Sequence, residues 1–225
     1  MTGGEGLVLF PGLGADAALF AQQTARFPGL TVPGWLEPRP AESLAVYAGR
    51  FADQLAAHPP EWVGGSSFGG MVALEVAKRL KPRGVFLIGS ARSPRSVSPL
   101  FRAGGAVARR LPIGAWSLAR RTLPGIARVL LAGNPDGRAI GSAMSPNVSS
   151  EFMRWGIGAI LDWPGLEDPG IPVHHVHGGA DLVMPLSRVK PDRVIPGAGH
   201  LLAVTHGGAV NDYLAETMGS AALTR

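Results

Sequence analysis

Short apolar runs recur along the chain and are bounded by glycine or proline. The first run, Leu7–Phe10, is apolar at every position and is followed by Pro11 and Gly12. A short continuous apolar run is typical of a strand that is buried on both faces of a parallel sheet. Apolar runs of this kind predict strands at Leu7–Phe10, Leu30–Val32, Glu61–Val63, Val85–Ile88, Val173–His177 and Asp192–Ile195.

Helical spacing marks the segments between these strands. One helix begins near Ser43, and its apolar residues recur on a single face at Leu44, Tyr47, Phe51 and Leu55. Strands that alternate with helices imply right-handed crossovers and a parallel sheet between layers of helices. The predicted fold class is therefore α/β, with a mostly parallel sheet flanked by helices. We expect the other helices to start near Ala15 and to cover Met71–Leu80 and Leu201–Met218.

The alternation of strands and helices stops after Ala91 and resumes at Gly170. Residues 92–169 show no strand pattern, and repeated prolines divide them into short helical segments. We therefore expect a helical cap, residues 92–169, inserted into one α/β core that comprises residues 1–91 and 170–225.

A glycine-rich stretch, Gly64–Gly70, lies between a predicted strand and a predicted helix. Within it Ser67 is flanked by Gly65 and Gly69, which is the G-x-S-x-G pattern of a nucleophile elbow. Such an elbow holds the serine in a strained turn, and its glycines let the strand and the helix pass closely. Ser67 is thus a candidate nucleophile, although a glycine-rich turn without chemistry would explain these five residues equally well.

Ser66 is the other serine of this stretch. As a nucleophile it would be flanked by Gly64 and Phe68, and phenylalanine does not fit the place of the second glycine. The steric requirement of the elbow therefore favours Ser67.

A serine hydroxyl needs a base within hydrogen-bond reach, and that base needs an acid that orients it. Asp181 follows the predicted strand Val173–His177, and His200 follows the predicted strand Asp192–Ile195. Open α/β sheets carry their sites at the carboxyl ends of the strands. The chain order Ser67, Asp181, His200 therefore predicts a serine, acid and histidine triad.

Other interpretations of these residues remain open. Asp181 has the residue type and position of an aspartate that stabilises a turn. His206 and His177 compete with His200, but we expect His206 within the last helix and His177 in support of the acid loop. Because alternate residues of a strand share a face, His175 and His177 could also bind a metal ion together. Apart from Asp181 no third ligand is evident nearby, and we expect no metal site.

These motifs together resemble the α/β-hydrolase superfamily. The similarity covers nearly everything outside the predicted cap, and it rests on Gly65–Gly69, His177–Pro185 and Gly197–Leu201 in the family's order. It implies a serine esterase or thioesterase with a helical cap. The core is expected to be shortened, because the first strand already precedes the oxyanion loop. Where many relatives have His-Gly after that strand, this chain has Pro11 and Gly12.

The resemblance also implies an oxyanion hole. This site binds the charged intermediate through backbone N–H groups, so a histidine side chain is not essential to it. We assign it to the N–H of Phe68, which follows the nucleophile, and to the N–H of Leu13 in the loop Pro11–Gly14.

The same loop allows a different class of function. Gly12–Ala17 fits the G-x-G-x-x-G/A dinucleotide pattern, with Glu37 about twenty residues later as a possible ribose partner. A single match of this kind is weak, and Glu37 lies in a loop broken by prolines. We expect no cofactor. A noncatalytic ligand-binding member of the hydrolase fold is a third possibility, because a fold does not imply a function.

Composition narrows the possible classes of protein. The chain has no cysteine, which excludes disulfides, thiolate catalysis and cysteine-based zinc sites. We find neither a signal-peptide pattern at the start nor an apolar run of about 18 residues that a membrane helix needs. We expect a cytoplasmic protein without a membrane span.

The net charge of +5 is distributed unevenly. Residues 92–150 contain nine arginines and one acid, Asp136, whereas the remainder of the chain carries −3. These arginines favour a solvated helical face, or a surface that steers an anionic substrate or an acidic carrier partner to the site. The cap has no recognisable nucleic-acid-binding motif, so we expect no nucleic-acid partner.

The cap also has apolar residues that would line the roof of a pocket, and ligand pockets are mainly apolar. We therefore expect a small-molecule ester with a hydrophobic acyl or alkyl group of modest size. The predicted function is a serine hydrolase that cleaves carboxylic esters, with hydrolysis of acyl thioesters as the nearest alternative.

Overall fold

The computed structural model describes residues 6–116 and 147–222. Within these residues the core is a sheet of five parallel strands in the order β1-β2-β3-β4-β5. The predicted α/β class with a parallel sheet is therefore confirmed. The strands are β1 (Leu7–Phe10), β2 (Trp62–Ser66), β3 (Gly84–Ile88), β4 (Val173–Gly178) and β5 (Arg193–Ile195).

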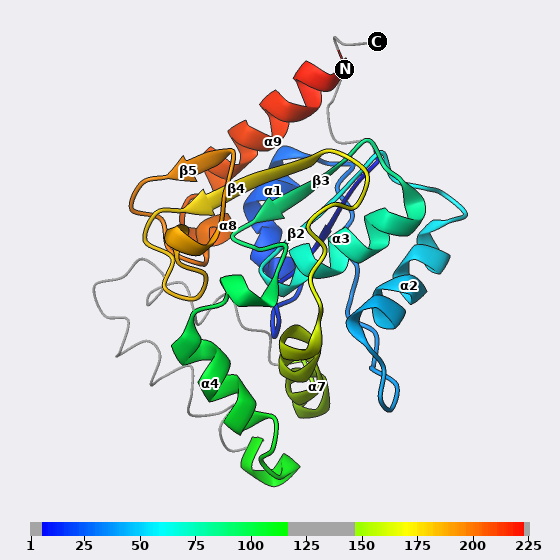
Figure 1. Ribbon diagram of the computed structural model, residues 1–225. Coiled ribbons are helices and arrows are strands. Elements are labelled where there is room, and N and C mark those ends of the chain that lie inside the picture. The colour runs from blue at the N-terminus through cyan, green and yellow to red at the C-terminus, as the bar shows by residue number, and fades with distance from the viewer. Residues whose placement is uncertain (1–5, 117–146, 223–225) are drawn as a thin grey trace.

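Helices cover both faces of the sheet (Figure 1). One hydrophobic cluster joins the sheet to α2 and α3, and a second cluster joins it to η1, α8 and α9, against which α1 packs. The helices on these faces are η1 (Ala17–Phe20), α1 (Ala21–Arg26), α2 (Leu44–Leu55), α3 (Phe68–Leu80), α8 (Leu202–Thr205) and α9 (Gly207–Ala222).

Alternation along the strands explains the two clusters. Successive side chains of a strand point to opposite faces, and here both faces are covered by helices. In β1, Val8 and Phe10 belong to the cluster on the α3 face, whereas Leu7 and Leu9 belong to the cluster on the α9 face. This double burial is the reason why the strand is apolar at every position.

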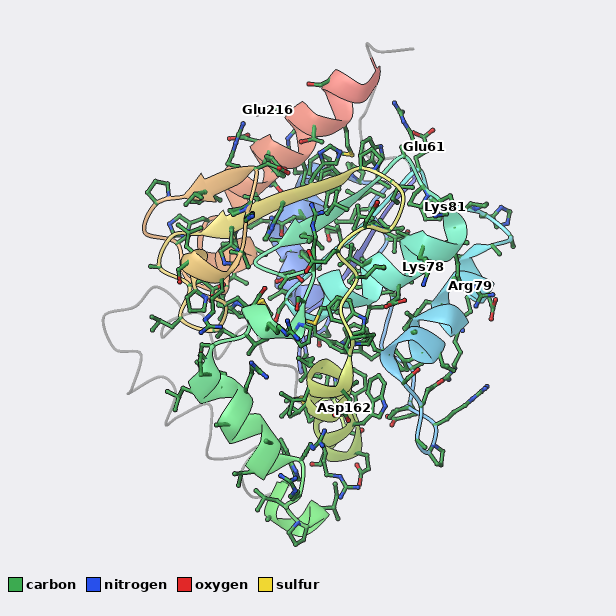
Figure 2. All side chains as sticks on the ribbon, in the orientation of Figure 1. Glu61, Lys78, Arg79, Lys81, Asp162 and Glu216 are labelled. Carbon is green, nitrogen blue, oxygen red and sulfur yellow. The ribbon has the colours of Figure 1, made fainter. Side chains whose placement is uncertain are left out.

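The helix termini follow from local sequence signals. Ser43 caps α2 because its side chain accepts a hydrogen bond from the backbone N–H of Val46. The last turn of α3 carries Lys78 and Arg79, which complement the negative end of the helix dipole. Both side chains are labelled in Figure 2 at the end of this helix. The chain leaves α3 through Lys81, which has left-handed backbone angles.

In the described part of the chain two further helices follow β3 and precede β4, and they lie below the sheet in Figure 1. They are α4 (Pro99–Ala108) and α7 (Ser150–Asp162). The short turn η2 (Pro94–Ser96) precedes α4, and the hydroxyl of Ser96 donates to the carbonyl of Arg188 in the short turn η3 (Leu186–Arg188), which follows β4. A salt bridge of 2.7 Å between Arg109 and Asp162 joins the ends of α4 and α7. Asp162 is labelled on α7 in Figure 2.

Two tryptophans attach α7 to the core. The indole N–H of Trp163 donates to the buried Glu75 carboxylate of α3 at 2.7 Å. The indole N–H of Trp155 donates to the carbonyl of Glu42 at 2.8 Å, just before α2. These contacts hold α7 against α3 and the start of α2.

Three of the predicted elements differ from the structure. The expected strand Leu30–Val32 is reduced to one parallel bridge between Thr31 and Val8, because Pro33 lacks the N–H that would continue the pairing. The expected helix Leu201–Met218 is broken at His206, so this residue ends α8 and does not lie within one helix. The helix expected from Ala15 begins as the 3₁₀ turn η1, which Asp16 caps.

None of the helices in residues 6–116 and 147–222 is long and apolar enough to cross a membrane.

Candidate active site

The nucleophile elbow connects β2 to α3. Ser66 is the last residue of β2 and is buried, whereas Ser67 lies between strand and helix with a positive φ of 53°. A positive φ is rare for a residue with a side chain and stores backbone strain. The Ser67 N–H donates to the carbonyl of Ile88 at 3.2 Å, which ties the turn to β3.

Close backbone contacts explain the two glycines of the elbow. A Cβ atom added to Gly65 would meet the backbone of Gly69, and one added to Gly69 would overlap the carbonyl oxygens of Phe10 and Pro11. Any side chain at Gly69 would therefore force β1 and α3 apart.

We expect Gly69→Ala to lower the free energy of unfolding by about 3 kcal/mol, because the new methyl group meets backbone rather than a side chain that can rotate. Urea denaturation measures this difference. Gly34→Ala is the control, since a Cβ there has nothing within 4 Å. An equal effect of both substitutions would contradict the steric reason given for Gly69.

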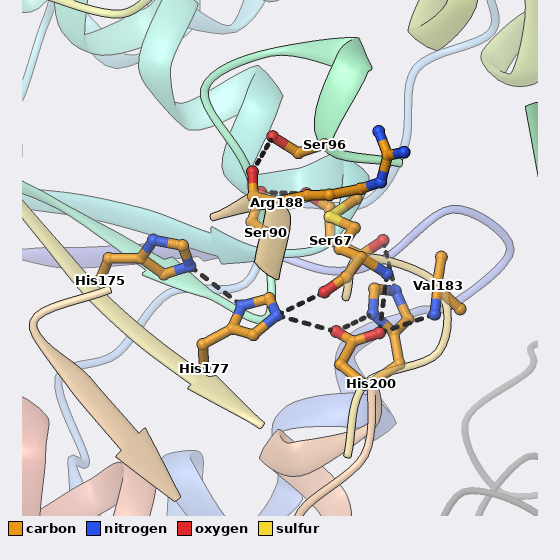
Figure 3. A network of polar contacts seen from close by, with 10 residues as sticks. Ser67, Ser90, Ser96, His175, His177, Val183, Arg188 and His200 are labelled. Atoms are coloured by element: carbon orange, nitrogen blue, oxygen red, sulfur yellow. Dashed lines mark hydrogen bonds and ion pairs between the residues drawn. The ribbon is translucent and has the colours of Figure 1, made fainter. Parts of the chain in front are cut away.

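The structure brings Ser67, His200 and Asp181 into one hydrogen-bonded line (Figure 3). His200 Nε2 lies 2.9 Å from Ser67 Oγ, and His200 Nδ1 lies 2.8 Å from Asp181 Oδ2. His200 comes from the loop between β5 and α8, and Asp181 from the loop after β4. All three therefore lie at the carboxyl ends of strands, as the sequence predicted.

The two carboxylate oxygens of Asp181 have different partners. Oδ1 accepts the backbone N–H groups of Val183 and Met184, each at 2.8 Å, whereas Oδ2 accepts from His200. Asp181 therefore stabilises a turn with one oxygen and faces the histidine with the other. The interpretation as a turn-stabilising residue describes Oδ1, and the role of Asp181 as the acid of a triad stays a prediction.

Asp181 is 3% exposed. Burial alone would raise the pKa of Asp181, but the charge of His200 and hydrogen bonds from His177, His200 and Met184 outweigh it, so this pKa lies well below its usual range. A lowered pKa means that ionisation favours the folded state. This stabilisation is present above about pH 4, where a free aspartate titrates, and is lost as the pH falls toward the native pKa.

The other histidines do not contact Ser67 in the described part of the chain. His206 Nδ1 forms a hydrogen bond of 2.9 Å with the hydroxyl of its neighbour Thr205. His175 and His177 lie side by side, as the strand periodicity predicted, but their facing nitrogens are 3.1 Å apart and share a hydrogen bond. No cluster of three or more metal-ligating side chains occurs among the residues the structure describes.

The candidate oxyanion donors lie beside the elbow. Phe68 is the first residue of α3, so its N–H has no acceptor within the helix and lies at the positive end of the helix dipole. The loop that contains Leu13 packs against the nucleophile, since a Cβ built on Gly12 would lie 3.8 Å from the Ser67 Cβ. Leu13 in turn packs against Gly156 of α7, so this helix lies over the loop.

One supporting residue was missed by the sequence analysis. The hydroxyl of the fully buried Ser90 donates to the carbonyl of Ser67 at 2.6 Å and so braces the strained elbow from β3. The only signal was its position, since Ser90 directly follows the strand-ending Gly89 at the edge of the sheet where the site lies.

The dinucleotide hypothesis gains no support from this geometry. The loop at Gly12 packs against the nucleophile elbow, and the side chain of Asp16 caps the short 3₁₀ helix η1. The Glu37 carboxylate accepts a hydrogen bond of 3.4 Å from Ser149, just before α7.

A large groove lies apart from these residues. It has a volume of about 1090 Å³ and runs between α7 and the segment 38–45. The described residues that line this groove do not include Ser67, His200 or Asp181, so we do not assign the groove to the reaction.

Comparison with known proteins gives the family. Residues 7–213 match the sequence pattern of the alpha/beta hydrolase family. The chain belongs to this family. A search among curated proteins finds no significant match.

Solved structures of alpha/beta hydrolases share the fold at low sequence identity. A thermophilic esterase from Thermogutta terrifontis has a TM-score of 0.72 and 18% identity, over 96% of this chain and 90% of that one. The enol-lactonase from Burkholderia xenovorans LB400 has a TM-score of 0.67 and 19% identity, over 93% and 89%. ClbQ from the colibactin NRPS/PKS pathway has a TM-score of 0.63 and 15% identity, over 97% and 98%. At these identities the likeness concerns the fold alone.

Proposed function

We propose that this alpha/beta hydrolase cleaves carboxylic esters through an acyl-enzyme on Ser67. The observation that carries the proposal is the unbroken line from Ser67 Oγ through His200 to Asp181 Oδ2, with distances of 2.9 and 2.8 Å. A hydroxyl is a poor nucleophile unless a base takes its proton, and here the Nε2 atom of His200 is placed to accept the proton of Ser67.

The reaction would proceed in two acyl-transfer steps. Ser67 Oγ attacks the ester carbonyl while its proton moves to His200 Nε2, and Asp181 holds the imidazole through Nδ1. The backbone N–H groups of Phe68 and Leu13 bind the oxyanion of the tetrahedral intermediate. His200 then protonates the leaving alcohol, and the C–O bond to it breaks. Water, deprotonated by His200, releases the acyl group by the same route and restores the serine.

The substrate is proposed to be a small ester with an apolar acyl or alkyl group. Structural neighbours described as an esterase and an enol-lactonase support ester chemistry on this fold. An acyl thioester on a carrier is the nearest alternative, since Arg102, Arg110 and Arg154 of the insertion are exposed and could attract an anionic substrate or partner. The predicted arginines Arg120, Arg121, Arg128 and Arg138 and the acid Asp136 lie outside the described residues.

A rate comparison tests the proposed substrate class. We expect p-nitrophenyl esters to be hydrolysed with a higher kcat/KM than coenzyme A thioesters of the same acyl group, at every chain length compared. Turnover of the thioesters alone would contradict the ester assignment. No turnover of either, together with no reaction of Ser67 with a phosphonate, would indicate a noncatalytic binding protein.

Ionic strength tests the role of the arginines. If they steer an anionic substrate, kcat/KM for the thioester should fall as the salt concentration rises from about 0.05 to about 0.5 M, while the rate with a neutral ester stays constant. Identical salt responses would remove the steering role and leave the arginines as a solvated surface.

A further inference from the structure

The hydrogen-bonded line of the candidate site continues beyond Asp181 into the core. Behind the carboxylate lie His177 and His175 (Figure 3), which are alternate residues of β4 and therefore share one face of the sheet. His177 is fully buried and His175 is 3% exposed. Neither side chain has a part in the acyl-transfer steps above, and two adjacent buried imidazoles are costly unless their hydrogen bonds are satisfied.

The partners of His177 fix the directions of its hydrogen bonds. His177 Nε2 lies 2.8 Å from the carbonyl oxygen of Met184 and 3.3 Å from Asp181 Oδ2. Both of these oxygens only accept, so Nε2 carries the hydrogen. In the neutral imidazole Nδ1 is then an acceptor, and His175 Nε2 at 3.1 Å is the group that donates to it.

His175 is suited to that task because it stays neutral. Burial is the main cause that lowers the pKa of His175, to about 3. Its backbone N–H donates to Asp192 Oδ2 at 2.7 Å, which fixes the strand beside the loop before β5. A neutral His175 with its hydrogen on Nε2 complements the tautomer of His177 that points a hydrogen at the acid loop, so the two rings fit one arrangement of hydrogen bonds.

Titratable and charged groups approach this pair from the segments before and after β5, from α9 and from the segment after β3. Asp192 lies before β5 and accepts a hydrogen bond of 3.1 Å from Tyr213 of α9. The positive charge of Arg92, which follows β3, contributes to the lowered pKa of His175. His200 approaches from the loop after β5 and shares Asp181 Oδ2 with His177.

We propose that His177 is a positioning residue for Asp181, and that His175 orients His177 by holding it in one tautomer. His177 ties the acid loop at two points, the carbonyl of Met184 and the Oδ2 atom of Asp181, which is the oxygen that faces His200. The inference rests on the proposed function, because it assigns how the acid of that triad is held.

The arrangement has two consequences for the reaction. The N–H of His177 withdraws part of the negative charge of Oδ2, so removing it leaves a stronger field at His200 and favours the protonated imidazole. The acid limb of the pH profile then moves to higher pH. Loss of the tie to Met184 also loosens the loop that carries Asp181, which lowers kcat, whereas no contact with substrate is lost and KM stays the same.

Paired variants separate this role from a contribution to packing. His177→Leu removes the donor, and His177→Gln retains an N–H near the position of Nε2. His175→Leu removes the group that orients His177, and His175→Gln retains a donor. His174→Leu is the matched control, because this histidine is in the same strand but packs on the other face against Trp62 and Phe86.

We expect His177→Leu to lower kcat about tenfold at unchanged KM and to move the acid limb upward by roughly 0.5 pH unit or more. His177→Gln should recover most of both effects. His175→Leu should show a smaller change in the same direction, which His175→Gln reverses, and His174→Leu should leave the pH profile unchanged. If His177→Leu does not fold, the His175 pair and His177→Gln decide the question.

The measurement is the pH dependence of kcat/KM on p-nitrophenyl butyrate, accompanied by the pH dependence of Ser67 labelling by a fluorophosphonate. Superimposable pH profiles for the wild type and the two leucine variants at 177 and 175 would overturn the positioning role while leaving the proposed function intact. Absence of labelling at Ser67 in the wild-type protein would instead overturn the proposed function, and this inference with it.

Discussion

Ser67→Ala lowers kcat for p-nitrophenyl butyrate by about 10⁶-fold, the loss expected when the nucleophile of a serine triad is removed. The methyl group has no oxygen to attack the ester, and His200 Nε2 loses the partner that lies 2.9 Å away. The fold should persist, because Ser67 is partly exposed and the elbow is held by backbone contacts of Gly65 and Gly69.

Ser66→Ala is the matched control for this substitution. Ser66 is the last residue of β2 and 2% exposed, so the variant changes the neighbouring hydroxyl without touching His200. We expect its kcat to stay within about tenfold of the wild-type value. Near-normal turnover by Ser67→Ala, with a large loss in Ser66→Ala, would move the nucleophile to Ser66 and contradict the elbow assignment.

Asp181→Asn lowers kcat by about 10⁴-fold, because it forces His200 into the wrong tautomer. The side-chain atom in the position of Oδ1 must accept the N–H groups of Val183 and Met184, so the amide oxygen takes this position. The amide NH₂ group then faces His200 Nδ1, which can only accept from it. The hydrogen of the neutral imidazole moves to Nε2, and His200 no longer takes the proton of Ser67.

Steady-state kinetics of Asp181→Asn, beside Asp53→Asn, measures this effect. Asp53 is exposed and pairs with Arg79 on the surface, so its variant should retain wild-type kcat. Circular dichroism establishes that both variants fold. An Asp181→Asn enzyme with a kcat near that of the wild type would show that His200 needs no acid at this position.

Much of the fold follows from short-range patterns in the sequence. Leu7–Phe10 is apolar throughout because helices cover both of its faces, and this pattern alone predicts a central parallel strand. The predicted strand Leu30–Val32 is shorter and contains Thr31, and Pro33 stops it after one bridge. The break at His206 precedes Gly207 and Gly208, and such a pair is a weak signal within an apolar run.

The candidate site was predictable for a topological reason. Asp181 and His200 follow strands whose carboxyl ends share an edge with the elbow, so their order in the chain is enough to suggest that they meet Ser67. The support from Ser90 depends on a side-chain distance between two separate segments, and no local pattern encodes it, whereas the pairing of His175 with His177 follows from the alternation of side chains along one strand. The catalytic roles of Ser67, Asp181 and His200 remain predictions, which the variants at Ser67 and Asp181 test.

The central claim is that Ser67 is an activated nucleophile, and labelling with a fluorophosphonate followed by mass spectrometry of the digested protein tests it most directly. We predict one phosphonyl group per chain on Ser67, no label in Ser67→Ala, and much slower labelling in Asp181→Asn. Unlabelled Ser67, or a label on Ser66, in a protein that still hydrolyses esters would contradict the account.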